Sequence, residues 1–168
     1  MQTSSPSSSI QTAHLADWIG TAILLPVCAH YVFRRFDITI LDSLCMLVFD
    51  AGRLAFEVVG PALAHLGGAA VLVLLPLLLI WYFSSHGYCL GIQVFMFWLG
   101  QNLIFLSRTV AATEGRHSSL LNRYEFDMHV LMSYLQLEHS IVLIEHTLFM
   151  LGIAIFLVLL VLPLYVRR

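Results

Sequence analysis

Residues 141–166 read IVLIEHTLFMLGIAIFLVLLVLPLYV, and this stretch decides the class of the protein. A helix of about twenty apolar residues crosses the roughly 30 Å hydrocarbon core of a bilayer. The stretch is long enough to do so, and Arg167 and Arg168 close it. It therefore predicts a transmembrane helix.

The whole chain of 168 residues has the same apolar character. Hydrophobic residues make up 60% and charged residues 11%, and the mean hydropathy is +0.88. A soluble domain carries about 25% charged residues, so this chain has too little charge to cover a globular surface. It contains no lysine and its net charge is −2. A nucleic-acid partner, which needs a basic face, is not expected.

Further apolar runs predict an all-α fold, a polytopic transmembrane helical bundle with about four to five membrane segments. A single transmembrane domain over residues 17–168 is expected, after a serine-rich tail at residues 1–16 that is predicted to be disordered. A long polar loop is expected from Arg108 to Asp127, and an amphipathic helix from Met128 to His139. The other candidate membrane segments are Trp18–Phe33, Ile38–Val58, Pro61–Phe83 and Tyr88–Ser107.

The arginines predict an orientation. If all five segments cross the membrane, Arg34 and Arg35 lie on the same side as Arg167 and Arg168. The positive-inside rule makes that side cytoplasmic, so the N-terminus is expected outside and the C-terminus inside. If Ile38–Val58 does not span, the topology changes.

One candidate segment carries a stripe of charge. Asp42, Asp50, Arg53 and Glu57 lie within about 80° of one another on a helix with 100° per residue. Two of these carboxylates lie three and four residues from Arg53, so the arginine is expected to be their internal counter-ion. Charge within a membrane segment usually faces a protein interior or a water-filled cavity. The stripe is therefore either a functional polar site, a structural ion cluster, or part of a helix lying at the membrane interface.

The residues around this stripe resemble a family. Residues 36–60 read FDITILDSLCMLVFDAGRLAFEVVG, similar to a helix that reads approximately FD..ILD...L.IHEAGHL.F...G in small bacterial membrane proteins. Those proteins are considered site-2-protease-like because of their HEAGH motif. The resemblance continues through Leu66-Gly67-Gly68, an apolar run at 76–79, FWLGQNL at 97–103, Asp127 with Leu131, and Leu137-Glu138. The positions that match family motifs include Phe49, Asp50, Arg53, Trp98, Gln101, Asn102 and Asp127.

The resemblance implies a zinc site that this chain has lost. In HExxH, two histidines four residues apart bind zinc and the glutamate activates the metal-bound water. Here Phe49 and Arg53 replace the histidines; phenylalanine cannot coordinate, and arginine is permanently cationic and repels a metal ion. The resemblance thus implies a degenerate, non-catalytic member with no cofactor, although intact members would hold zinc. Asp127, a possible third ligand in such members, is expected to be a helix N-cap here.

Three histidines offer an alternative metal site: His129, His139 and His146. On one helix, His139 and His146 differ by about 20° but lie about 10.5 Å apart along the axis. Two ligands of one metal ion favour a spacing of three or four, so hydrogen bonding at helix interfaces is the expected role. A metalloenzyme whose site is rebuilt from these histidines and nearby carboxylates stays open.

Three functions follow. The first is a non-catalytic protein of the bacterial inner membrane that binds or scaffolds another membrane protein within the lipid bilayer. The second is a transporter or ion-conducting protein that uses the charged stripe. The third is the rebuilt metalloenzyme.

Overall fold

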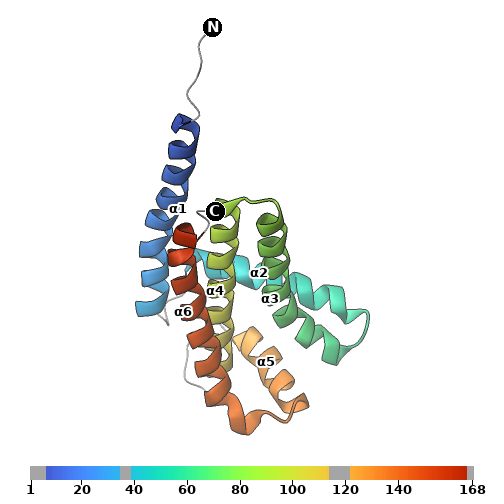
Figure 1. Ribbon diagram of the computed structural model, residues 1–168. Helices are drawn as coiled ribbons and strands as arrows, with labels where there is room; N and C mark the ends of the chain where they lie inside the picture. The colour runs from blue at the N-terminus through green and yellow to red at the C-terminus, as the bar shows by residue number, and fades with distance from the viewer. Residues whose placement is uncertain (1–6, 35–38, 114–121, 166–168) are drawn as a thin grey trace.

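The computed structural model describes residues 7–34, 39–113 and 122–165, and these contain helices and no strands (Figure 1). This confirms the predicted all-α bundle of the membrane type. The elements are α1 (Ser7–Phe33), α2 (Ile40–Glu57), α3 (Pro61–Ser85), α4 (Cys89–Ala112), α5 (Asn122–Tyr134), the short 3-10 helix η2 (Glu138–Ser140) and α6 (Ile141–Tyr165).

Among the described residues, three helices are long and apolar enough to cross a membrane: Leu63–Ser85, Cys89–Ala112 and Ile141–Pro163. Trp18–Phe33 of α1 is a shorter apolar helix. The chain is therefore an integral membrane protein. Helix α2, predicted as a further membrane segment, is not among the three, because four charged residues interrupt its apolar character.

Helix α4 forms the centre of the bundle. It contacts α1, α2, α3, α5 and α6, and 61% of its most apolar stretch is buried, against 28% for α3 and 22% for α6. Helices α1, α4 and α6 run alongside one another, whereas α2 runs across the bundle (Figure 1). The beginning of α1 and the end of α6 lie at one end of the bundle, and α5 lies at the other.

Glycines allow the closest helix contacts. A Cβ atom at Gly100 of α4 would lie 2.5 Å from the Phe156 ring of α6, and one at Gly52 of α2 would lie 2.8 Å from the Gly67 carbonyl oxygen of α3. A larger side chain at these positions would require the Phe156 ring or the α3 backbone to move. Small residues of this kind let membrane helices approach closely.

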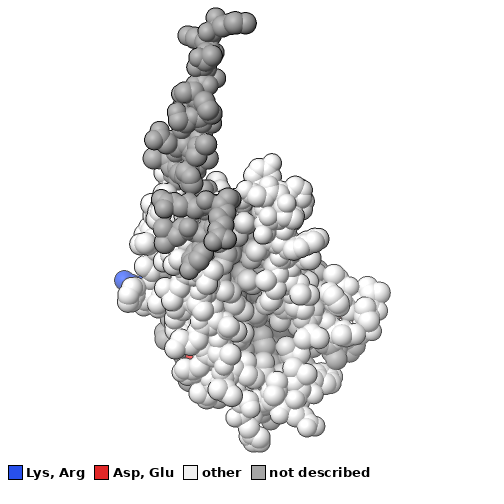
Figure 2. Space-filling model, viewed as in Figure 1, with Lys and Arg blue, Asp and Glu red and all other residues white. Residues whose placement is uncertain are grey.

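The outer surface is apolar, as a lipid-facing surface must be. Figure 2 shows almost no charged side chains on the visible described surface. Leu78 of α3 and Leu143 of α6 are 61% and 69% exposed. Trp81 and Tyr82, near the end of α3, are also exposed. Tryptophan and tyrosine are enriched at membrane–water interfaces.

Three details of the sequence-based prediction need correction. The serine-rich segment predicted as a disordered tail is helical from Ser7 onward, since extending a helix is easier than starting one. Arg108, predicted to begin a polar loop, lies inside α4. Asp127, predicted to be an N-cap, lies within α5, which begins at Asn122 and ends at Tyr134.

Candidate functional site

The first turn of α2 is fixed by a buried ion pair. Arg108 Nη2 of α4 donates to Asp42 Oδ1 at 2.5 Å. The other oxygen, Asp42 Oδ2, accepts from the backbone N–H of Thr39 at 2.7 Å and from its hydroxyl at 3.0 Å. The Tyr31 hydroxyl of α1 forms a hydrogen bond with the same threonine side chain. Both carboxylate oxygens are thus occupied, and this cluster joins α1, α2 and α4.

A second polar cluster lies about one turn further along α2, where this helix contacts α4. The Cys45 thiol donates to Asn102 Oδ1 at 3.0 Å, and Gln101 Nε2 donates to Cys45 Sγ at 3.3 Å. Asn102 Nδ2 donates to the Leu72 carbonyl oxygen of α3 at 2.7 Å. These contacts give Gln101 and Asn102, two positions of the FWLGQNL segment, a role in holding three helices together. Trp98 of the same segment is half-buried, with its ring centroid 6.1 Å from that of Phe95.

The Cys45 thiol is not a nucleophile in this setting. Burial raises its pKa to about 12, with the nearby Asp42 carboxylate adding to the rise. Because the thiolate is the reactive species, this thiol is inert at neutral pH. The other two cysteines, Cys28 and Cys89, are also buried and form no disulfide.

Phe49 and Asp50, the first two positions of the HExxH-like stretch, face α5. Phe49 is 1% exposed, and its ring centroid lies 5.4 Å from that of Tyr124 in an edge-to-face contact. A Cβ atom at Gly68 of α3 would come within 2.7 Å of the Phe49 ring. The Tyr124 hydroxyl donates to Asp50 Oδ2 at 3.2 Å. The position that the resemblance assigns to the first metal ligand is thus part of the protein core.

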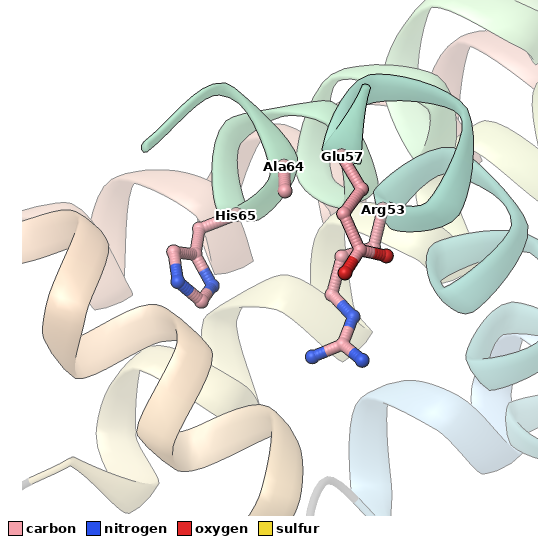
Figure 3. Close-up of a pocket in the computed structure, with 4 residues that line it drawn as sticks. All are labelled: Arg53, Glu57, Ala64 and His65. Atoms are coloured by element: carbon pink, nitrogen blue, oxygen red, sulfur yellow. The ribbon is translucent and has the colours of Figure 1, made fainter. Parts of the chain in front are cut away.

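Arg53 and Glu57, further along α2, line a pocket with Ala64 and His65 of α3 (Figure 3). We call this the hairpin pocket; its volume is about 280 Å³. Arg53 and His65 are half-buried, and Glu57 is exposed. Figure 3 shows the guanidinium of Arg53 and the imidazole of His65 extending into the same space from two helices. The pocket therefore offers one fixed cation, one carboxylate and one imidazole.

The structure divides the charged stripe into parts with different surroundings. Asp42 pairs with Arg108 across the bundle. Asp50 accepts a hydrogen bond from Tyr124. Arg53 and Glu57 lie at the hairpin pocket. The four side chains share a helix face, as their spacing predicts, and Arg53 as the counter-ion of Asp50 and Glu57 stays a prediction.

The three candidate metal-binding histidines are separated. His129 is exposed on α5, where it borders a shallow depression with Val130 and Ser133. His139 is exposed in η2. His146 is exposed on α6, and its Nδ1 lies 2.8 Å from the Val142 carbonyl oxygen one turn earlier. Within the described part of the chain, no three His, Cys, Asp or Glu side chains gather in a way that could hold a metal ion. The described residues thus give the rebuilt metal site no support.

Sequence reasoning missed Arg108, Tyr124 and His65. A signal for Arg108 was present, because Asp42 needs a counter-charge and the residues after Arg108, TVAA, continue the helix. No comparable signal identifies Tyr124 or His65, whose contacts depend on how α3 and α5 pack beside α2.

Comparisons of this chain with protein-family models, with curated proteins and with solved structures find no match. The resemblance to site-2-protease-like proteins therefore stays a prediction that rests on the quoted motifs.

Proposed function

We propose that this protein is a non-catalytic integral membrane protein that binds a partner molecule at the hairpin pocket. One observation carries the proposal. Of the four charged residues on α2, Asp42 and Asp50 hold neighbouring helices, whereas Arg53 and Glu57 face a space that a ligand can enter. Charged side chains that line a pocket in a membrane protein are candidates for binding.

The packing of Phe49 supports the absence of catalysis. A metal site needs an open coordination position for water or substrate, and Phe49 is enclosed by Gly68 and Tyr124. The protein is thus proposed to be a degenerate relative of site-2-protease-like proteins in a bacterial inner membrane. Gly52, Gln101 and Asn102, which match the motifs of the resemblance, would preserve the helix packing after the zinc ligands were replaced.

We also propose that α2 enters the bundle from one side of the membrane and does not cross it, so that α1, α3, α4 and α6 make four crossings. The direction of α2 across the bundle supports this. Four crossings put both termini on one side, unlike the five crossings considered from sequence. The opposite side then carries Arg34, Arg35, Arg116 and Arg123, against Arg167 and Arg168 on the side of the termini. The positive-inside rule makes the first of these sides cytoplasmic.

The transporter interpretation has less support. A conducting path needs charged groups that face water, and Asp42 is 1% exposed with both its oxygens occupied. A conducting path along the charged stripe would therefore be interrupted at Asp42, which water does not reach.

Site-specific photo-crosslinking in intact membranes tests the binding proposal. A benzoyl-phenylalanine is placed at Val58, which is 93% exposed and adjoins Glu57, and in a control at Phe33, which is 86% exposed at the end of α1. We expect one predominant adduct at Val58 that disappears when Arg53→Gln is added. The same adducts at both positions, or adducts that do not depend on Arg53, would overturn binding at the hairpin pocket.

A further inference from the structure

The hairpin pocket lies where a membrane helix begins. Ala64 and His65, two of its residues, stand at the start of the apolar stretch Leu63–Ser85. The polar headgroups of a bilayer occupy the level at which such a stretch begins. The pocket is therefore at the depth of phospholipid headgroups.

The charges of the pocket match a zwitterion better than a simple anion. The Arg53 guanidinium, with its planar fork of donors, suits a phosphodiester, and the His65 imidazole adds a further donor. Glu57 would repel a second negative group but can accept hydrogen bonds from an ammonium. A pocket of about 280 Å³ is smaller than the roughly 300–1,000 Å³ of most drug-sized sites, which fits a headgroup rather than a folded partner.

Apolar side chains lie next to these polar groups along the chain. Leu54 follows Arg53 and is 60% exposed, and Leu63 and Leu66 flank the α3 residues of the pocket and are 41% and 42% exposed. These exposed side chains offer acyl chains an apolar surface on the same helix turns as the polar residues of the pocket. A free phosphate or a soluble headgroup would leave that surface unused.

We propose that the hairpin pocket binds the headgroup of a zwitterionic phospholipid of the phosphoethanolamine type. Arg53 and His65 hold the phosphodiester, and Glu57 accepts hydrogen bonds from the ammonium. A choline headgroup carries the same charge but cannot donate hydrogen bonds to Glu57, and a glycerol headgroup has no cation for it. This inference rests on the proposed function, because it names the ligand of the same pocket.

Lipid retention tests the inference. The full chain is reconstituted in nanodiscs with equal amounts of phosphatidylethanolamine, phosphatidylcholine and phosphatidylglycerol, extracted gently, and the retained lipids are counted by native mass spectrometry. We expect phosphatidylethanolamine to be enriched about tenfold over phosphatidylglycerol, since charged hydrogen bonds distinguish them. Glu57→Gln should remove this preference, and Arg53→Gln should reduce retention of all three lipids. Arg34→Gln, an exposed arginine at the end of α1, is the matched control and should retain the parent pattern.

Other outcomes identify which claim fails. Equal retention of the three lipids by the parent, or the same pattern in Arg53→Gln and Arg34→Gln, overturns the headgroup proposal. Displacement of the lipid by millimolar inorganic phosphate or glycerophosphoethanolamine would point to a soluble ligand and also overturn it. One outcome of the photo-crosslinking experiment is that capture at Val58 depends on Arg53 but the captured molecule is not a lipid. In that case the headgroup proposal fails and the proposed function stands. If no adduct depends on Arg53, both fail.

Discussion

Asp42 of α2 and Arg108 of α4 form an ion pair inside the bundle, with 2.5 Å between Oδ1 and Nη2. Each side chain is almost completely buried. The acidic residue at the first turn of α2 thus finds its counter-charge on another helix, 66 residues away along the chain. Arg53 lies further along α2 and lines the hairpin pocket. The stripe therefore combines a structural role at its beginning with a proposed binding role at its end.

Arg108→Met should destabilise the protein strongly. The substitution leaves the buried Asp42 carboxylate without its counter-charge, and breaking a buried pair in this way costs about 3–5 kcal/mol. Thermal unfolding in detergent measures the loss. The double variant Asp42→Asn/Arg108→Met removes both charges and should recover much of it. Equal stability of Arg108→Met and the control Arg34→Met would show that the pair does not hold α2 in place.

Gly52→Ala should also destabilise the protein, because the new Cβ would meet the Gly67 backbone oxygen at 2.8 Å and Val71 Cβ at 2.9 Å. Overpacking of this kind costs about 1–3 kcal/mol. The neighbouring Ala51 is exposed, so Ala51→Leu is a matched control that should be tolerated. A normal melting temperature for Gly52→Ala would mean that α2 and α3 are further apart than described.

The purified protein should contain no stoichiometric zinc. The positions of the two histidine ligands are occupied by Phe49, which is buried in the core, and by Arg53, which repels a metal ion. Elemental analysis of protein purified without chelators provides the test. About one zinc ion per chain, lost on replacing His129 or His139 with alanine, would instead favour a rebuilt metal site.

The stability of the protein should fall in alkaline solution through Cys45. Its thiol has a pKa of about 12 in the folded protein against 9.0 for an unperturbed cysteine. A raised folded pKa stabilises the protein below the unfolded pKa, and this contribution is lost as the pH rises from 9.0 toward about 12. Over that interval the free energy of unfolding falls by about 1.4 kcal/mol per pH unit. Melting temperatures of the parent and of Cys45→Ala above pH 9.0 provide the comparison; parallel decreases would exclude this thiol as the cause.

The sequence predicts the parts of this fold that depend on local pattern. The apolar run at 141–166 predicts α6, and Pro61, at the first position of a helix, predicts the start of α3. The motif-like residues Gly52, Gln101 and Asn102 are all at helix contacts, so the resemblance includes residues with packing roles. Local pattern does not give the direction of α2, since an amphipathic helix can cross a membrane or lie on it. It also does not place His65 and Arg53 at one pocket, because that arrangement depends on how α3 folds back along α2.

The central claim is that the charged helix α2 lies on one side of the membrane and exposes the hairpin pocket there. Its most direct test is labelling of single cysteines by a membrane-impermeant maleimide in sealed vesicles of known orientation. The variants are Arg34→Cys before α2, Glu57→Cys at its end, and Tyr88→Cys at the α3–α4 turn; all three positions are exposed, whereas the native cysteines are buried. We predict that Arg34→Cys and Glu57→Cys react from the same side and Tyr88→Cys from the other. Reaction of Arg34→Cys and Tyr88→Cys from one side and Glu57→Cys from the opposite side would show that α2 crosses the membrane, and would contradict this account.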